Sequence, residues 1–364
     1  MPQLEIPPVT AGAFSIARYK LKIDLFLDLN KQLNTLIDTL PPKLWKGYRL
    51  VAGDGTTVNL PISKSTIGHF GLFRESSHGG KTVLANACML YDVLSDFAMA
   101  SCISPFCEGE KTLMARLLQQ TPLTNSIIIL DRGFSSFSFL KLMIANSLDY
   151  CVRLKTSGNL FAQHVLEDSR LDFITDWIPS EAERNTCKKK QIECSPIQVR
   201  VTKITLPSGE IEVLVSSLLD MGTFTLEDIK ELYRLRWAIE EGFKDLKPKM
   251  KLEQFGCKRQ EGIYQEFYSH IFMMNLTTLI GMEAQQTIEI KTKARKYRYK
   301  YNWSNAFKFI QNSFVQLFKS DDIEAVIELI RRQIEKSIIA IVPNRRFVRQ
   351  THSINKHRAS PMYK

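Results

Sequence analysis

Residues 233–247, YRLRWAIEEGFKDLK, constrain the fold more than any other segment of this chain. Tyr233, Arg236, Glu240 and Lys247 stand at offsets of 0, 3, 7 and 14 residues, so on an α-helix their side chains point within about 60° of one another. Apolar residues occupy the neighbouring arc: Leu232, Leu235, Ile239, Phe243 and Leu246. The segment therefore predicts an amphipathic helix that buries one stripe and presents a carboxylate flanked by two cations and a phenol.

The polar face of this predicted helix has two interpretations. Lys, Arg and Glu at helical spacing commonly form a solvated face. A carboxylate beside cations also suits a phosphate-bearing ligand held next to a metal ion. Glu241 points about 80° away from Glu240 on such a helix, which singles out Glu240. Lys244 is either a further phosphate contact or a solvated side chain.

Two aspartates upstream each follow an apolar, strand-like run. In VAGDGTTVNLP, Asp54 stands where the apolar run gives way to an expected Gly-Thr turn, and in SIIILDRGF, Asp131 comes directly after Ile127–Leu130. A carboxylate at the end of a buried strand, followed by glycine, is well placed to bind a cation. The alternative for each is an aspartate that only forms a turn.

Taken together, these motifs resemble the DDE transposases of bacterial insertion sequences, in the insertion-sequence-four branch defined by a Tyr-x2-Arg-x3-Glu-x6-Lys signature. Residues 233–247 match all four positions, and the DGT and DRGF segments around the aspartates also look like this family. The resemblance covers about residues 10–310. The four-position signature is specific, whereas DGT or DRG alone would be weak.

The resemblance implies a transposase that cuts DNA at transposon ends and joins the freed 3′-hydroxyl to target DNA, in cut-and-paste movement of an insertion sequence. It implies that Asp54, Asp131 and Glu240 are both the catalytic residues and the metal ligands. Three carboxylates with no His or Cys ligand nearby favour hard divalent cations. We therefore expect two Mg²⁺ or Mn²⁺ ions, with Asp54 bridging them.

The same resemblance implies a DNA-binding face around Glu240. Arg236 and Lys247 look like phosphate clamps, and Tyr233 would support the strand by a hydrogen bond or by stacking. The expected partner is double-stranded DNA, as transposon ends and as target, bound by a homodimer. No membrane and no small-molecule substrate are expected.

The composition agrees with a polyanionic partner. Lys and Arg number 49 against 38 Asp and Glu, a net charge of +11, although many basic proteins never bind DNA specifically. The seven cysteines include no CxxC pair, which predicts reduced thiols in place of a zinc site. Because no apolar run reaches the length of a membrane span and no signal peptide opens the chain, we expect the protein in the bacterial cytoplasm, associated with the nucleoid.

The hydrophobic periodicity predicts an α/β, ribonuclease H-like core, a mixed sheet flanked by helices. Strand patterns at YRLVAGD, KTVLANACMLYDVL and DFAMASCISP follow one another, and helices then alternate with strands. An all-β insertion is expected before the last catalytic helix, as the family carries. The expected segments are a short helical N-terminal region at 1–47, the first part of the core at 48–155, the β insertion at 156–220, the core with the Glu240 helix at 221–260, and a helical C-terminal region with a basic tail at 261–364.

The N-terminal region departs from the family. One helix is expected over 13–40, ended by Pro41 and Pro42, and only about 47 residues precede the first strand. Relatives usually carry a longer helical region that recognises the terminal inverted repeats. The expectation is a shortened DNA-binding domain, or end recognition that has moved elsewhere.

A basic and aromatic run at 291–303, KTKARKYRYKYNW, is a second candidate DNA contact. Lys293, Arg295, Arg298 and Lys300 would hold phosphates while the interleaved rings stack on bases or sugars. The alternative is a solvated linker before a helix that begins near residue 304.

The sequence contains three weaker candidates for a functional role. Trp177 lies in the expected insertion, where this family can use an aromatic ring to hold a flipped base, but packing is the more common role of a tryptophan. His78 is expected to line a turn. The basic tail from Pro343 lacks periodicity and would be a non-specific electrostatic arm.

Two other functions stay open from the sequence alone. One is a decayed or domesticated transposase that only binds DNA, and the other is a structure-specific nuclease of ribonuclease H fold. The intact acidic triad argues against a loss of catalytic activity. The Tyr-Arg-Glu-Lys helix and the long insertion before it disfavour the nuclease. Terminal inverted repeats flanking the gene would separate the transposase from both.

Overall fold

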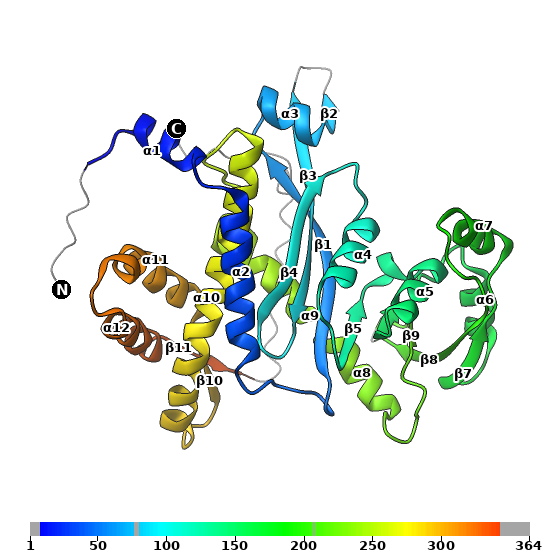
Figure 1. The fold of residues 1–364 in the computed structure, drawn as a ribbon. Helices are drawn as coiled ribbons and strands as arrows, with labels where there is room; N and C mark the ends of the chain where they lie inside the picture. The colour runs from blue at the N-terminus through cyan, green and yellow to red at the C-terminus, as the bar shows by residue number, and fades with distance from the viewer. Residues whose placement is uncertain (1–7, 76–79, 207, 343–364) are drawn as a thin grey trace. The chain divides into compact units, whose positions relative to one another are not determined.

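The computed structural model describes residues 8–75, 80–206 and 208–342 (Figure 1). The chain forms two compact units. The helical unit comprises Met1–Leu40, Asn59–Val83 and Lys244–Lys364, and the sheet unit comprises Pro41–Val58 and Leu84–Phe243. His78 and the tail from Pro343 lie outside the described residues. Within the described part of the chain, no helix is long and apolar enough to cross a membrane.

The sheet unit is built on five strands in the order β4-β3-β1-β5-β6. Their bounds are β1 Arg49–Leu60, β3 Lys81–Asp92, β4 Phe97–Pro105, β5 Ser126–Leu130 and β6 Asp149–Arg153. β3 and β4 pair antiparallel, whereas β1, β5 and β6 pair parallel. Helices α4 (Glu110–Gln120) and α5 (Phe137–Ala145) make the parallel connections. Three consecutive strands followed by two parallel ones confirm the expected ribonuclease H-like core.

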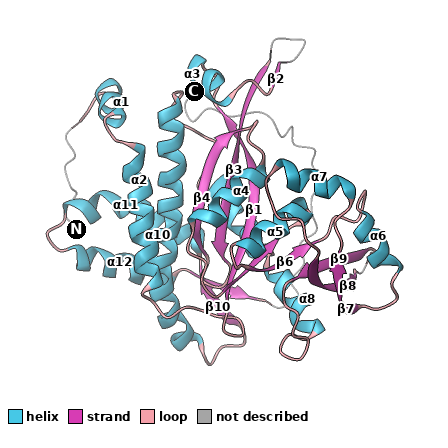
Figure 2. Ribbon diagram, turned by 45° about the vertical axis from the view of Figure 1, so that its right-hand side comes forward, coloured by secondary structure: helices cyan, strands magenta, loops and turns pink. Residues whose placement is uncertain are grey.

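One hydrophobic cluster joins α4 and α5 to one face of this sheet (Figure 2). Alternate strand residues such as Val51, Leu90 and Ile128 belong to it, together with Leu117 of α4 and Leu140 of α5. Because side chains alternate between the faces of a strand, the residues between them point to the opposite face. That opposite face receives the helix that carries Glu240.

The segment predicted as one helix around Glu240 is two helices and a wide turn. α8 is Leu226–Leu235, α9 is Trp237–Lys244, and a π-helical turn at Asp245–Lys249 contains Pro248. At the break, the N–H of Arg236 donates to the carbonyl of Tyr233 at 3.1 Å, three residues back instead of four. Proline cannot donate an N–H to the helix, which accounts for the wide turn. The side-chain directions expected for one regular helix therefore do not hold over the whole segment from Tyr233 to Lys247.

α9 lies directly on β3. A Cβ added at Gly242 would stand 3.0 Å from the ring of Tyr91 and 3.3 Å from the end of Met89. These two residues alternate with Cys88 and Leu90, which face the α4 and α5 side. The absence of a side chain at Gly242 therefore lets α9 approach the opposite face of the sheet closely.

The expected all-β insertion is wrong, because it also contains two helices. Its strands are β7 Asp172–Trp177, β8 Ile197–Thr205 and β9 Ile211–Ser216, and its helices are α6 Leu160–Glu167 and α7 Glu181–Lys189. α7 begins with a capping box between Ser180 and Glu183 and buries only Cys187, so it lacks the apolar stripe by which a helix is recognised. The three strands extend the main sheet, because β9 pairs antiparallel with β6.

The helical unit is organised around α10 (Gln260–Thr292). Buried residues of α10, α11 (Trp303–Lys319) and α12 (Ile323–Lys336) form its hydrophobic cluster. Its other elements are α1 Ala11–Tyr19, α2 Ile23–Asp38, α3 Lys64–Phe70, β2 Arg74–Glu75, β10 Arg298–Tyr301 and β11 Ile338–Ile341. The single helix predicted over 13–40 is thus broken in two, and Gln265 of α10 donates to the Arg18 and Leu21 carbonyls at the break.

Trp177 has a packing role in this structure. Its side chain is fully buried, stacks on Phe161 with ring centroids 4.3 Å apart, and meets Phe137 edge-on at 5.9 Å. A buried, sandwiched indole has no open face for a base, so the alternative of a base-holding Trp177 is not supported.

We expect Trp177→Ala to lower the free energy of unfolding by about 3–5 kcal/mol, because it removes a large side chain from a packed core. Denaturant unfolding followed by circular dichroism measures this loss. Trp237→Ala is the matched control, since that tryptophan is 51% exposed and should cost much less. Equal stability of the two variants would contradict the packing role.

Candidate active site

The register of β1 and β5 sets two aspartates next to each other. The parallel pairing ends at Gly53 opposite Leu130, which is also the last residue of β5. Asp131 follows Leu130 directly, and Asp54 is the next residue along β1. The turn expected after Asp54 is wrong, because β1 continues to Leu60. Asp54 is therefore the first β1 residue beyond the β5 pairing, and its carboxylate neighbours that of Asp131.

Gly53 determines the face on which Asp54 lies. A Cβ at Gly53 would stand 2.5 Å from the Leu130 side chain and 2.9 Å from the sulfur of Met114 in α4. Position 53 thus points toward α4 and leaves no room for a side chain. Since strand residues alternate, Asp54 points to the opposite face, which is the face that α9 covers.

The surroundings of Asp54 disfavour its ionised form. Burial raises its pKa to about 6, with further increases from the carboxylates of Asp131 and Glu110. The N–H of Gly55, which donates to Asp54 at 2.8 Å, and the Arg236 guanidinium act in the opposite direction without cancelling the increase. An ionised carboxylate pair in a half-buried site is a donor set that fits a hard divalent cation.

Asp131 is fixed by the turn that follows it. It is the N-terminal cap of a short 3-10 helix at Arg132–Phe134, and its Oδ1 accepts a hydrogen bond from the N–H of Gly133 at 2.8 Å. The second carboxylate oxygen, Oδ2, stays available for a ligand because a carboxylate accepts at both oxygens. The glycine that the sequence placed two residues after Asp131 therefore orients the carboxylate.

Glu240 is held by Arg236 in this structure. The two side chains form an ion pair at 3.0 Å. Arg236 is buried, and its Nε has no hydrogen-bond partner. Within the described ranges, no three His, Cys, Asp or Glu side chains are grouped so that they could hold one metal ion. The structure therefore brings Asp54 and Asp131 together while Glu240 stays on Arg236.

Tyr233 lies beneath this ion pair. Its side chain is buried, burial raises the pKa of its phenol, and its ring is 5.7 Å from the Arg236 guanidinium. Lys244 is exposed at the last position of α9. Lys247 lies in the π-helical turn of the helical unit, where its Nζ is 3.5 Å from Glu253. The four signature residues thus have different surroundings: Tyr233 and Arg236 are buried, whereas Glu240 and Lys247 are half-buried.

The basic run at 291–303 exposes its charges and buries part of its aromatic surface. Lys293, Arg295, Arg298 and Lys300 are all exposed. In β10 the alternate residue Tyr301 packs so closely on α10 that a Cβ at Gly281 would be 2.5 Å from its ring. Trp303 stacks on Phe307 at 5.7 Å. The four cations are thus exposed, while the rings of Tyr301 and Trp303 are occupied within the unit.

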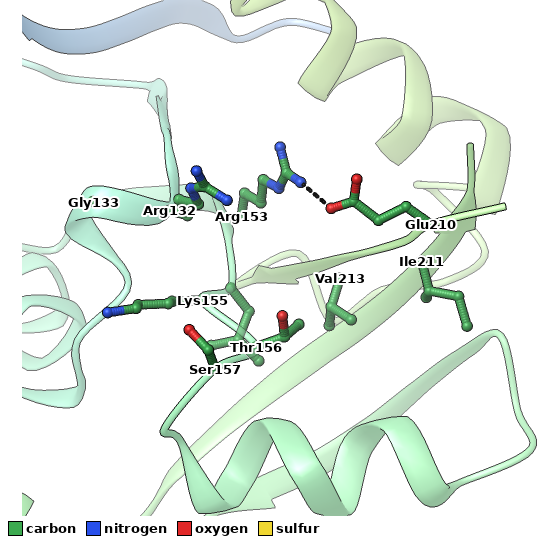
Figure 3. A pocket seen from close by; sticks show the side chains of 10 residues that line it. Arg132, Gly133, Arg153, Lys155, Thr156, Ser157, Glu210, Ile211 and Val213 are labelled. Atoms are coloured by element: carbon green, nitrogen blue, oxygen red, sulfur yellow. Dashed lines mark hydrogen bonds and ion pairs between the residues drawn. The ribbon is translucent and has the colours of Figure 1, made fainter. Parts of the chain in front are cut away.

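A basic pocket beside Asp131 was not found from the sequence. Its volume is about 430 Å³, and Arg132, Arg153 and Lys155 line it (Figure 3). Arg153 is paired with Glu210 and Glu212, at 3.1 Å each. Arg132 could have been noticed as the neighbour of Asp131. Arg153 and Lys155 could have been inferred from their place at the carboxyl end of a parallel strand, where ligands of such sheets bind.

Glu110 is the second site residue that the sequence did not reveal. It is the first residue of α4, and a Cβ at Gly55 would be 2.8 Å from its carboxyl carbon. Burial and the charge of Asp131 raise the pKa of Glu110. An acidic residue at a helix N-terminus is common, so no sequence signal distinguished it from a helix-capping charge.

Comparisons with known proteins agree on one family, the DDE transposases. A family model described as a transposase DDE domain matches residues 45–276. The transposase InsG for insertion sequence element IS4 of Escherichia coli (strain K12) is 22% identical over 244 residues, which are 65% of this chain. The matched region spans about half of that relative, 53% of its length.

One solved structure is also similar, the piggyBac transposase synaptic complex with hairpin DNA. Its TM-score is 0.44 at 10% sequence identity, over 81% of this chain and 58% of that chain. A likeness at this level adds nothing to the site described above.

We expect Asp54→Asn to stabilise the protein at pH 8 and to leave its stability unchanged near pH 4. In the folded protein the pKa of Asp54 is about 6, above the ordinary aspartate value of 3.8, so ionisation of Asp54 costs stability above pH 6 and not below pH 4. The gain at pH 8 is at most about 3 kcal/mol, measured as melting temperature without divalent cations. Adding Mn²⁺ should raise the melting temperature of the wild type more than that of the variant. Glu241→Gln is the control, and an unchanged melting temperature of Asp54→Asn at pH 8 would count against the crowded acidic pair.

Proposed function

Because the chain belongs to the DDE transposase family, in the insertion-sequence-four branch, we propose that it cuts DNA at the ends of a mobile element and joins the freed 3′ ends to target DNA. The observation that carries this proposal is the register that sets Asp54 beside Asp131, on the sheet face covered by the Glu240 helix. Two carboxylates stand there, and Arg132, the residue after Asp131, lines a basic pocket.

Asp54, Asp131 and Glu240 are the proposed metal ligands and catalytic residues. Members of this family generally use divalent metals, and the crowded Asp54–Asp131 pair suits Mg²⁺ or Mn²⁺. The carboxylate oxygens of these three residues would hold the ions. When bound, such ions lower the pKa of the attacking hydroxyl and stabilise the leaving oxygen.

Arg236 and Glu240 are proposed to exchange partners when DNA binds. In the present state the guanidinium neutralises Glu240. A DNA phosphate is an alternative partner for the guanidinium, which binds phosphate oxygens well. Arg236 would then hold the strand, and Glu240 would be released to join the aspartates. Tyr233 keeps Arg236 in place during this exchange, by the contact of its ring with the guanidinium.

Further basic residues are proposed to hold the rest of the DNA. Arg132, Arg153 and Lys155 of the basic pocket would bind phosphates beside Asp131. Lys244 and Lys247 are also proposed to bind DNA phosphates. We also propose a homodimer in the DNA complex, since an element has two ends to be cut.

We expect alanine at Asp54, Asp131 or Glu240 to abolish strand cleavage while leaving DNA binding within a few-fold of wild type. Losing a catalytic carboxylate removes several kcal/mol of transition-state stabilisation, which is a rate loss of at least about a thousand-fold. Cleavage of a labelled duplex carrying the element's terminal inverted repeat, with Mn²⁺ or Mg²⁺, measures this.

Glu241→Ala is the matched control, because Glu241 is the exposed neighbour of Glu240 on α9. It should cut at the wild-type rate. Metal-dependent cutting by Glu240→Ala at a rate comparable to wild type would remove Glu240 from the active site.

Replacing Lys293, Arg295, Arg298 and Lys300 with Gln should weaken duplex binding by orders of magnitude at moderate salt. Each lost phosphate contact should also reduce the slope of log K against log salt by about one. Fluorescence anisotropy over a salt series measures both. Stability should change little, since exposed charges contribute only tenths of a kcal/mol each.

The control for this variant removes the same charge elsewhere in the helical unit, with Lys31, Lys308, Lys319 and Lys336 changed to Gln. These four side chains are exposed too. If both quadruple variants lose affinity equally, the effect is one of net charge and the 291–303 run is not a DNA contact.

A further inference from the structure

The carboxylate of Glu110, the first residue of α4, lies against the backbone of the residue that follows Asp54. A Cβ added at Gly55 would be 2.8 Å from the carboxyl carbon of Glu110 and 2.9 Å from its Oε1. The carboxylate therefore occupies the space that a side chain at position 55 would fill. Because residue 55 is a glycine, a third acidic group can approach the strand directly beside Asp54.

Glu110 interacts with both aspartates. Burial and the charge of Asp131 raise the pKa of Glu110. The charge of Glu110 also contributes to the raised pKa of Asp54, after burial and the charge of Asp131. Because β5 ends at Leu130, no β5 residue lies beside Gly55, and the three carboxylates meet at this end of the strands. Among the described residues, Glu110 forms no ion pair with a lysine or arginine.

The remaining carboxylate of the proposed metal site is engaged with a cation of the protein. Glu240 forms its ion pair with Arg236 at 3.0 Å, and Arg236 is buried. Withdrawal of the carboxylate would leave a buried guanidinium uncompensated. Glu240 therefore stays on Arg236 until another anion takes its place.

We propose that Glu110 is the third acidic group of the cation site while no DNA is bound, a role that rests on the proposed function. A cation that arrives before DNA then binds at Asp54 and Asp131 beside the charge of Glu110, and Glu240 joins after its exchange on Arg236. Within the described ranges, no three His, Cys, Asp or Glu side chains are grouped so that they could hold one ion. Glu110 is therefore a positioning residue, which acts through its charge and through water instead of by direct contact with the ion.

Mn²⁺ binding to the DNA-free protein tests this role. Electron paramagnetic resonance of the unbound ion gives the Kd for Mn²⁺ without DNA and without cleavage. Glu110→Gln keeps the size of the side chain and removes its charge, so it should weaken Mn²⁺ binding about ten-fold or more. Glu110→Asp should bind Mn²⁺ more tightly than Glu110→Gln, because it restores the charge.

Two further variants separate Glu110 from the other acidic residues. The double variant Arg236→Met with Glu240→Met removes both charges of the ion pair together, so it should bind Mn²⁺ as the wild type does. Glu181→Gln is the matched control, because Glu181 is also the first residue of a helix in the sheet unit and is exposed. It too should bind Mn²⁺ normally, which distinguishes the cation site from a favourable charge at a helix N-terminus.

Melting curves without divalent cations establish that each variant is folded. A folded Glu110→Gln protein with the Mn²⁺ affinity of the wild type overturns the role of Glu110. An equal loss of affinity in Glu181→Gln overturns it too, because the effect is then one of net charge. A loss in the double variant as large as that in Glu110→Gln also overturns it, since Glu240 would then already belong to the cation site.

This inference and the proposed function fail separately. If Asp54→Asn and Asp131→Asn both bind Mn²⁺ as tightly as the wild type, the cation site itself fails, and Glu110 with it. If both lose affinity while Glu110→Gln does not, only the role of Glu110 fails. If Mn²⁺ binding depends on all three residues but the acidic residues prove dispensable for cutting, the proposed reaction fails and the cation site stands.

Discussion

The point where the parallel pairing of β1 and β5 ends is the constraint on which the candidate site depends. Pairing stops at Gly53 and Leu130, and each strand continues with an aspartate. Burial and the charge of Asp131 keep the pKa of Asp54 raised to about 6, although the Arg236 guanidinium acts against the increase. A fold that places two such groups together gives up stability. That loss is understandable where a function requires the pair.

The sequence predicted this pair because its signals are local. Four apolar residues before Asp131 and a glycine after it indicate a buried strand that ends in a turn. The continuation of β1 beyond Asp54 was missed because Gly55 and Thr56 favour a turn locally, whereas pairing within the sheet keeps the strand extended. α7 was missed because it buries only Cys187. Glu110 could not be predicted, since only tertiary packing brings its helix against Gly55.

The break between α8 and α9 is a similar case. Helical spacing correctly indicated that Arg236 and Glu240 face each other, and they form an ion pair at 3.0 Å. It did not indicate that Arg236 is buried or that its Nε is left without a partner. An arginine side chain does not lose its proton in proteins. The charge of a buried arginine must therefore always be compensated by an anion. Removing Glu240 from it is costly unless another anion replaces the carboxylate. A DNA phosphate is an anion of this kind, and the proposed exchange would keep the buried charge of Arg236 compensated.

The charges around the aspartates also couple the two kinds of ligand that the site would hold. Arg132, Arg153 and Lys155 would attract a phosphate backbone toward the pocket that they line. Asp54, Asp131 and Glu110 repel the same backbone as it approaches the point of cleavage. A cation on the aspartates removes that repulsion, and a bound phosphate adds negative charge that favours the cation. Each ligand would therefore strengthen the binding of the other.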